Sequence, residues 1–346
     1  MYETCLEAGP GHAVKKSSSG FGRVFLVLIM TCFAFDIAHA RPELGPPSIK
    51  LRTNLSRIVV AELERIGDDH KLTISVSENL HNEGEDSIII RGDAQTAGKL
   101  ELGETYVIAL VAWDVKRFPR VVKPRRDGAV IINLEGATPA IFQPNANLVE
   151  LLTWDLDESL QSPDALLPII LRGMAEEDPQ LQDFFATELV TRPRLYAKLS
   201  RKQRKTVASY IGNPDYPPSA RELMLGDAAF SNLMLSRRAK LGIAREIMIT
   251  HPAYVEFGSP YGGLIRNAMK IMEDSSKASD SIIAERWLTS NQPTLVESAA
   301  SVIYAVNRES LIPALERASE HTLLERPSRE ALRNLLNRYR PSLAGN

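Results

Sequence analysis

Apolar residues change their spacing once along this chain, near residue 146, and this change limits the possible folds more than any other feature. From Ser48 to about Ile141, short runs rich in β-branched residues alternate with turn residues, as in strands. From Asn147 onward, apolar residues recur every three or four positions, as on one face of a helix. The sequence therefore predicts an α+β chain with two domains, β-rich over residues 41–145 and α-helical over residues 146–346.

Five β-branched or aromatic runs are separated by turn residues, and we expect each run to form a strand. They cover residues 58–63, 72–76, 87–90, 106–113 and 129–134. Short strands with long connections are typical of a small antiparallel barrel or sandwich. The segment from Gly92 to Leu100 lacks the serine or threonine of a phosphate-binding loop, so we interpret it as a hairpin connection.

The order of apolar phrases in the first half is similar to that of the OB-like netrin/metalloproteinase-inhibitor family. The phrase that carries this resemblance is Leu102-Gly103-Glu104-Thr105-Tyr106. The resemblance implies an OB-like barrel. Inhibitors of that family bind a protease zinc through an N-terminal cysteine, whereas processing of this chain would expose Arg41, so the resemblance does not extend to the inhibitory chemistry.

Helix-start signals recur every 15 to 25 residues through the second half. Some are cap residues before a proline, and others fit the capping box, in which a cap residue and the third helical residue satisfy each other's backbone amides. The predicted starts are Asn147, Ser162-Pro163, Asp178-Pro179, Ser200 with Gln203, Ser219 with Glu222, Ser259-Pro260, and Thr294 with Glu297.

Short amphipathic helices must pair and stack to bury their apolar faces. Residues 166–174 with 181–190, and 282–288 with 295–306, resemble HEAT-type repeats of about 40 residues. A HEAT-like solenoid or helical array is therefore expected, and a compact orthogonal bundle is the alternative.

The segment from residue 24 to residue 40 is typical of a secretory signal. Lys15, Lys16 and Arg23 precede the apolar run, and Ala38 and Ala40 form a small-x-small cleavage site. We expect residues 1–40 to be removed, with residues 1–13 a spurious leader upstream of a start at Val14. A membrane anchor is the alternative, although the run is shorter than the roughly 20 apolar residues of a spanning helix.

Cleavage after Ala40 would remove both cysteines, Cys5 and Cys32. Disulfides, thiol catalysis and cysteine-based zinc sites would then be excluded. A cysteine-free exported protein suits a bacterial periplasm, so we expect a Gram-negative source and a periplasmic or secreted location. The net charge of −2 argues against a dedicated nucleic-acid binder.

Catalytic motifs are absent from the sequence. No Gly-x-Ser-x-Gly or His-Glu-x-x-His occurs, and after cleavage four histidines remain, none spaced as a metal pair. We therefore expect no catalytic residue, metal or cofactor to be identifiable.

Two kinds of feature remain as possible binding sites. Seven basic residues without an acidic one among them fall within residues 192–205, and a second basic group lies at residues 116–126. Aromatic side chains stand in two proline-containing loops, at residues 212–218 and 251–258. The predicted binding residues are Arg192, Arg194, Lys198, Arg201, Lys202, Arg204, Lys205, Tyr216, Tyr254 and Phe257.

These patterns favour an exported, non-enzymatic binding or scaffold protein of the cell envelope, whose helical surface contacts a protein partner. One alternative is a hydrolase or lyase of envelope polysaccharide, which would need a cleft with at least two carboxylates. A second alternative is a protein that binds an anionic lipid or glycan through the basic residues. Such binding would weaken steeply as the salt concentration rises.

Overall fold

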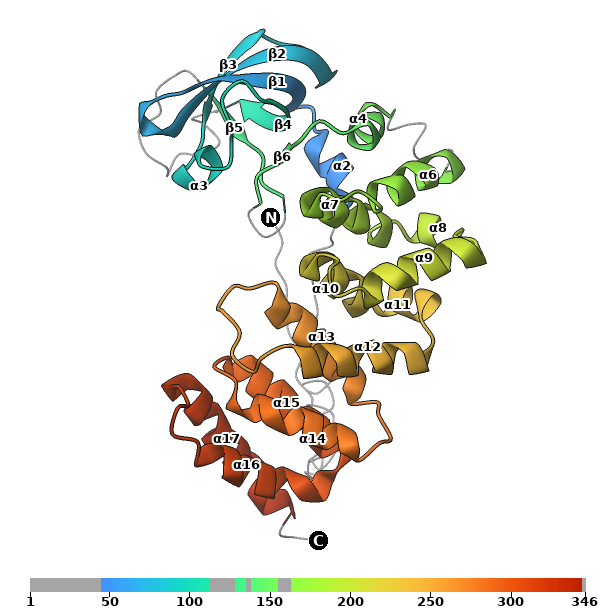
Figure 1. The fold of residues 1–346 in the computed structure, drawn as a ribbon, viewed down its shortest axis with the longest axis vertical. Coiled ribbons are helices and arrows are strands. Elements are labelled where there is room, and N and C mark those ends of the chain that lie inside the picture. Colours follow the sequence, from blue (N-terminus) through green and yellow to red (C-terminus); the bar gives the residue numbers. More distant parts are fainter. Residues whose placement is uncertain (1–44, 113–127, 135–137, 155–162, 344–346) are drawn as a thin grey trace, which may run out of the picture. The chain divides into compact units, whose positions relative to one another are not determined.

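A computed structural model describes residues 45–112, 128–134, 138–154 and 163–343 (Figure 1). Within these residues the chain is α+β: a closed barrel of five strands is followed by a long series of helices. The predicted fold class is thereby confirmed. The predicted signal sequence, including Ala38 and Ala40, and the basic group at 116–126 lie outside the described residues.

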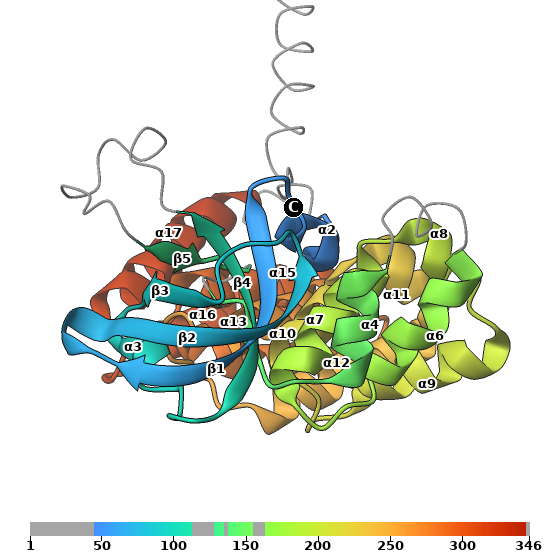
Figure 2. The ribbon, with the colours of Figure 1, turned by 90° about the horizontal axis from the view of Figure 1, so that it is seen from above.

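The barrel is closed by pairing between its first and fourth strands. The strands are β1 (Ser56–Ile66), β2 (Lys71–His81), β3 (Ser87–Arg91), β4 (Thr105–Ala112), β5 (Ala129–Ile131) and β6 (Ile141–Phe142). Their order is β1-β2-β3-β5-β4-β6, and β1 also pairs with β4. The β3–β5 pair is parallel and the others are antiparallel. Figure 2 shows β1 and β2 running side by side. The five predicted strands are confirmed.

The segment between β3 and β4 is a crossover, so the predicted hairpin connection at residues 92–100 is wrong. β5 lies between β3 and β4 in the barrel, and these two strands therefore do not pair. The connection contains a short helix, α3 (Ala94–Ala97), capped by Asp93, whose carboxylate accepts from the Thr96 amide at 2.7 Å. The sequence signal for this cap was an aspartate three residues before a threonine.

Alternating residues of the barrel strands serve two different cores. On β1, Val59 faces the barrel interior while its neighbour Ile58 packs with the helices. On β4, Ile108 and Val107 divide in the same way. This follows from the two-residue period of a strand, which sends successive side chains to opposite faces. Each fully buried aliphatic side chain stabilises the fold by about 1.5–3 kcal/mol, so both faces contribute.

The helix that precedes the barrel packs against the helical region. This helix, α2 (Pro47–Leu51), contacts α7, where the backbone amide of Ser48 donates to the carboxylate of Glu188. Arg192 contacts the same two residues: its Nε donates to Glu188 Oε2 at 2.9 Å, and its Nη2 donates to the Ser48 hydroxyl at 3.0 Å. A helix within the residues predicted as β-rich is therefore tied to the helical region by hydrogen bonds between Ser48 and a buried ion pair of that region.

The helices of the second region stack in pairs. The second helix of each pair also contacts the second helix of the next pair, in the series α7, α10, α13, α15 and α17. The helices are α4 (Ala146–Thr153), α6 (Pro163–Gly173), α7 (Pro179–Val190), α8 (Pro193–Tyr196), α9 (Arg201–Gly212), α10 (Pro218–Gly226), α11 (Ala228–Met234), α12 (Arg237–Thr250), α13 (Tyr261–Met272), α14 (Ser279–Glu285), α15 (Pro293–Val306), α16 (Leu311–Ser319) and α17 (Arg326–Leu343).

A proline marks the start of every helix in this series. The prolines are Pro179, Pro218, Pro260, Pro293 and Pro327, at intervals of 33 to 42 residues. Proline suits the first helical position because its backbone has no amide hydrogen to leave unpaired there. The repeat is therefore visible in the sequence at the helix starts.

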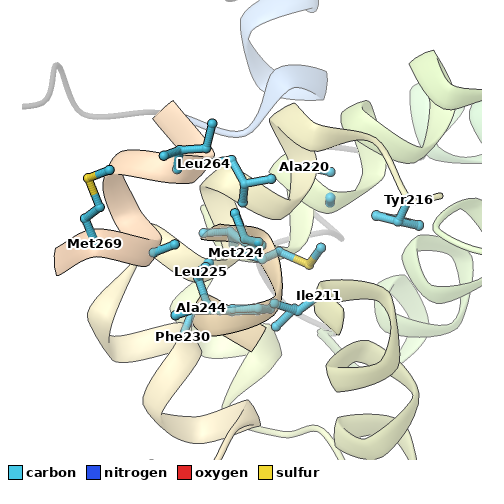
Figure 3. Packing of buried hydrophobic residues seen from close by; sticks show 14 of the residues in the cluster. Ile211, Tyr216, Ala220, Met224, Leu225, Phe230, Ala244, Leu264 and Met269 are labelled. Carbon is cyan, nitrogen blue, oxygen red and sulfur yellow. The ribbon is translucent and has the colours of Figure 1, made fainter. Parts of the chain in front are cut away.

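Apolar side chains from successive pairs form one continuous core. Figure 3 shows Ile211 of α9 and Ala244 of α12 near Met224 and Leu225 of α10. All four are buried and belong to the same cluster as the outer face of the barrel. Stability of the helical region is thus distributed over layers rather than concentrated in one centre.

Helix starts were predicted correctly where the cap is local. Asp178 caps α7 through the Gln180 and Leu181 amides, and Ser200 and Gln203 form the capping box of α9. Helix α4 is capped by Asn145, so the predicted start at Asn147 is two residues late.

Two predicted capping boxes, at Ser219 and at Thr294, are wrong. Helices α10 and α15 begin at Pro218 and Pro293, before those residues, and have no side-chain cap of their own. At the start of α10, a carboxylate of the neighbouring layer takes the place of a local cap. The Ser219 hydroxyl donates to the carboxylate of Asp183 on α7.

The start of α13 also lies close to a carboxylate of the preceding layer, that of Glu222 on α10. A Cβ on Gly263, in the first turn of α13, would lie 2.0 Å from Glu222 Oε1 of α10. A carboxylate near a helix N-terminus is favourable because unpaired amides and the helix dipole are positive there. Acidic residues on one layer thus support the helix start of the next.

Candidate functional site

The N-terminal ends of the second helices meet along one edge of the stack. Asp183 near the start of α7 contacts the start of α10, and Glu222 near the start of α10 contacts the start of α13. Gln292, which precedes α15, contacts residues that precede α13. We call these helix ends and the loops before them the loop edge.

The most distinctive part of the loop edge is the aromatic loop, residues 251–260. Side chains from the next layer fix its backbone at Val255. The Val255 amide donates to Asn291 Oδ1 at 2.9 Å, and Asn291 Nδ2 and Gln292 Nε2 donate to the Val255 carbonyl at 3.0 and 3.1 Å. The Val255 side chain is buried. The loop is therefore held in one conformation at its middle.

On either side of this anchor, the loop exposes two aromatic side chains. Tyr254 is 64% exposed and Phe257 is 99% exposed. Gly258 follows with φ +81°, a conformation that glycine adopts without strain. Leu323, in the loop before α17, is 84% exposed. Among the described residues, Phe257 and Leu323 are the most exposed large hydrophobic side chains, and both lie on the loop edge.

The first residues of the aromatic loop are also fixed. Arg286 donates to the carbonyls of Ile249 and His251 at 2.8 and 2.9 Å, and the His251 ring lies 4.6 Å from the ring of Tyr261. Burial, and then the positive charge of Arg221, lower the pKa of His251 below its usual value. The imidazole is therefore neutral at neutral pH, and the loop does not depend on its charge there.

The predicted basic residues divide into two groups. Arg192 is paired with Glu188, and Arg204 donates to the carbonyls of Leu199 and Ala197 at 2.9 and 3.3 Å. Both side chains therefore have a role in holding the helices. The other predicted basic residues are exposed: Arg194, Lys198, Arg201, Lys202 and Lys205.

Tyr216, which was predicted to lie in a contact loop, is buried between helices. Its hydroxyl donates to the Met174 carbonyl at 3.2 Å, and its ring stacks on Tyr210 with 4.9 Å between centroids. Burial, followed by the neighbouring Tyr210 and Asp183, raises the pKa of Tyr216. The ring closes the end of a helix pair and leaves no surface for a ligand.

Asp183 lies beside this tyrosine. Burial raises the pKa of Asp183, and hydrogen bonds from Ser219 and from the Ala220 amide oppose the rise. Its Oδ1 atom is buried and has no hydrogen-bond partner among the described residues. The carboxylate therefore supports α10 at the cost of its own desolvation.

A small pocket of about 130 Å³ lies between the barrel and the start of α7. Gln180 shapes it by donating to the carbonyls of Pro139 and Ile141 at 3.2 and 2.9 Å. It is lined by Thr96, Lys99, Leu100, Tyr106, Thr138, Pro139, Ile141, Phe142, Gln143, Asp178 and Gln180. Ligand sites usually enclose about 300–1,000 Å³. Asp178 is its single carboxylate and already caps α7, so this pocket lacks the carboxylate pair of a glycosidase.

The described residues hold no group of three or more histidine, cysteine or acidic residues placed to bind a metal ion. None of their helices combines the length and apolar character that a membrane span requires.

No protein-family model matches the chain, and comparisons with curated proteins and with solved structures gave no significant match. What the chain does must therefore be inferred from its own residues and their arrangement.

Sequence reasoning found Tyr254 and Phe257 but missed the residues that fix them. Asn291 and Gln292 look like ordinary cap residues before Pro293, and nothing local connects them with Val255, 36 residues earlier. Leu323 was also missed, because it stands next to Leu324, which is buried, and nothing in the sequence tells the two leucines apart. The recurring prolines offered a signal, since Val255 and Asn291 each lie a few residues before a proline of successive repeats, Pro260 and Pro293.

Proposed function

We propose that this chain is an exported, non-enzymatic binding protein of the bacterial cell envelope that contacts a protein partner through the loop edge. The observation that carries this proposal is Phe257, which is almost fully exposed on a loop whose backbone is fixed beside it. Burial of a phenylalanine on a partner is worth about 1.5–3 kcal/mol.

Rigidity makes this loop a better binding element than its exposed area alone suggests. A flexible loop loses conformational entropy when it binds, and that loss reduces affinity. Here the hydrogen bonds from Asn291 and Gln292 have already ordered Val255 in the free protein. Aromatic residues, including phenylalanine and tyrosine, are enriched at protein interfaces.

The same proposal assigns an OB-like type to the barrel and a HEAT-like type to the helices. Closure of β1 on β4, the parallel β3–β5 pair and the helix between β3 and β4 support the first. Proline-marked intervals of 33 to 42 residues and layer-to-layer contacts support the second. Stacks of this type use extended surfaces for binding.

Site-specific photocrosslinking in intact cells tests the partner proposal. A photoreactive residue at position 257 should give a discrete crosslinked species, and the same residue at Ile282, which is 70% exposed on α14, is the matched control. Once the partner is identified, Phe257→Ala should weaken binding at least tenfold, whereas Ile282→Ala should leave it unchanged. Equal crosslinking at both positions would contradict the proposal.

Export is tested separately. Cell fractionation should place the protein in the periplasm, and N-terminal sequencing should begin at Arg41. Recovery of the chain in the cytoplasm with an intact leader would contradict this part of the proposal and leave the loop-edge test unaffected.

A further inference from the structure

A strongly basic surface lies on α8 and α9, in a part of the stack that the proposed function does not use. It consists of the exposed side chains of Arg194, Arg201, Lys202 and Lys205, which we call the basic surface. None of the four forms an ion pair with another described residue. The segment from residue 192 to residue 205 contains no acidic residue.

Stability of the helix does not account for this arrangement. Arg201 and Lys202 occupy the first turn of α9, where the helix dipole disfavours positive charge. Arg201 and Lys205 are four residues apart, a spacing at which like charges repel. Exposed positions of a helix accept glutamate or glutamine at least as well as lysine. The basic residues therefore act against the local stability of α9, and a ligand accounts for them better.

The chemistry of the surface points to a polyanion. Clustered lysine and arginine side chains without neutralising neighbours create a local positive potential that concentrates anions. On one helical face, neighbouring side chains stand about 5–6 Å apart, a spacing on the scale of one sugar unit. Arg201 and Lys202 each stand one turn from Lys205, so a chain that carries carboxylates or sulfates can place charges against either pair.

A lipid surface fits less well. Helices that bind membranes combine basic residues with apolar side chains that enter the bilayer. Among the described residues, no large hydrophobic side chain is exposed on α8 or α9. The basic surface therefore has the charges for electrostatic attraction and lacks the residues for insertion.

We infer that the basic surface of α8 and α9 binds an anionic polysaccharide. This site is distinct from the loop edge, and a partner protein and a polysaccharide chain can occupy the two surfaces independently. Binding should be electrostatic, so affinity should fall steeply as salt is raised from low to physiological concentration.

The test uses the chain from Arg41 to Asn346, which lacks the predicted signal sequence, and heparin as the probe. Affinity is measured by calorimetry at low salt for the wild type and for the double variant Lys202→Glu, Lys205→Glu. Glutamate at position 202, in the first turn, favours the helix dipole, and glutamate at position 205 stands four residues from Arg201, so this variant should fold at least as well as the wild type. The expected result is a loss of heparin affinity of about tenfold or more.

A matched control separates the local surface from the overall charge. Arg333 and Arg338 are exposed on α17 and form no ion pair with another described residue. The double variant Arg333→Glu, Arg338→Glu changes the net charge by the same amount and should keep heparin affinity within about twofold.

Three outcomes would overturn the inference: no heparin binding by the wild type at low salt, equal loss in the two double variants, or binding to vesicles containing phosphatidylglycerol but not to heparin. Loop-edge variants such as Phe257→Ala should bind heparin normally, so failure of this inference and failure of the proposed function are distinguishable.

Discussion

The barrel and the helical stack bury their apolar side chains in opposite ways. The barrel closes on itself through the β1–β4 pair, so each of its five strands has at least two neighbours. The stack grows layer by layer, and each helix pair is supported by the next. A closed sheet leaves no free edge. A stack necessarily leaves a row of loops, and the fixed aromatic loop belongs to that row. The comparison teaches that the loop edge proposed for partner binding lies where the architecture is open.

The largest expected effect comes from the buried ion pair that joins two layers of the stack. Asp280 is buried and accepts from Arg245 Nη2 at 2.7 Å and from the Ser275 hydroxyl. Asp280→Asn should lower the free energy of unfolding of the stack by about 3–5 kcal/mol, because an arginine is left without its counter-charge. Hydrogen exchange should show the loss in α12 and α14 and leave the barrel amides protected.

An exposed pair between the same kinds of residue is the control. Glu285→Gln removes the contact with Arg317, in which both side chains reach solvent, and should cost less than about 1 kcal/mol. Equal destabilisation by both variants, or loss of protection in the barrel, would contradict the layer-by-layer description.

Next in size is a cavity in the barrel. Leu110 on β4 is buried in the interior cluster, so Leu110→Ala should cost about 2–4 kcal/mol. Because the strands form a closed ring, protection should fall in all of β1 to β5 together. Urea denaturation followed by hydrogen exchange measures both quantities. Loss confined to β4 would show that the barrel does not behave as one unit.

A smaller effect is expected from the anchor of the aromatic loop. Asn291→Ala removes two hydrogen bonds to Val255, each worth about 0.5–1.5 kcal/mol. Limited proteolysis should cleave the loop faster, while the thermal midpoint falls by only a few degrees. Asn307→Ala, at the end of α15, is a control that should not change loop cleavage. An unchanged cleavage rate in Asn291→Ala would contradict the role given to this residue.

The smallest effect is the pH dependence that Asp183 gives to the stack. Burial raises its pKa in the folded protein above the ordinary value of 3.8, so folding favours the protonated form. The resulting stability is fully present below the unfolded pKa and is lost as pH rises through the folded pKa. Relative to Asp183→Asn, the wild type should therefore lose stability as pH increases above about 4. A difference that stays constant with pH would contradict the direction of this shift.

Local signals in the sequence predicted much of the fold. The five barrel strands follow from short β-branched runs bounded by turn residues, and the start of α9 follows from Ser200 and Gln203, which contact each other within one turn. Both signals involve residues close in sequence, where spacing alone determines which groups meet.

Signals between layers could not be predicted from spacing. Ser219 fits a capping box, but the structure gives its hydroxyl to Asp183, 36 residues away. The basic segment differs, because Arg192 pairs with Glu188 only four residues earlier, a spacing that the sequence shows. For Ser219 the deciding partner lies one layer away. The position of that partner follows from the stack rather than from the local sequence.

The contact between α2 and α7 also has a consequence in time. Ser48 is separated from Glu188 by 140 residues, so at about 5–20 residues per second the ribosome delivers the second partner roughly 7 to 28 seconds after the first. All strands of the barrel are complete before Glu188 exists. The barrel can therefore close during synthesis before α2 has its partner. The α2–α7 contact then joins a segment made early to one made much later.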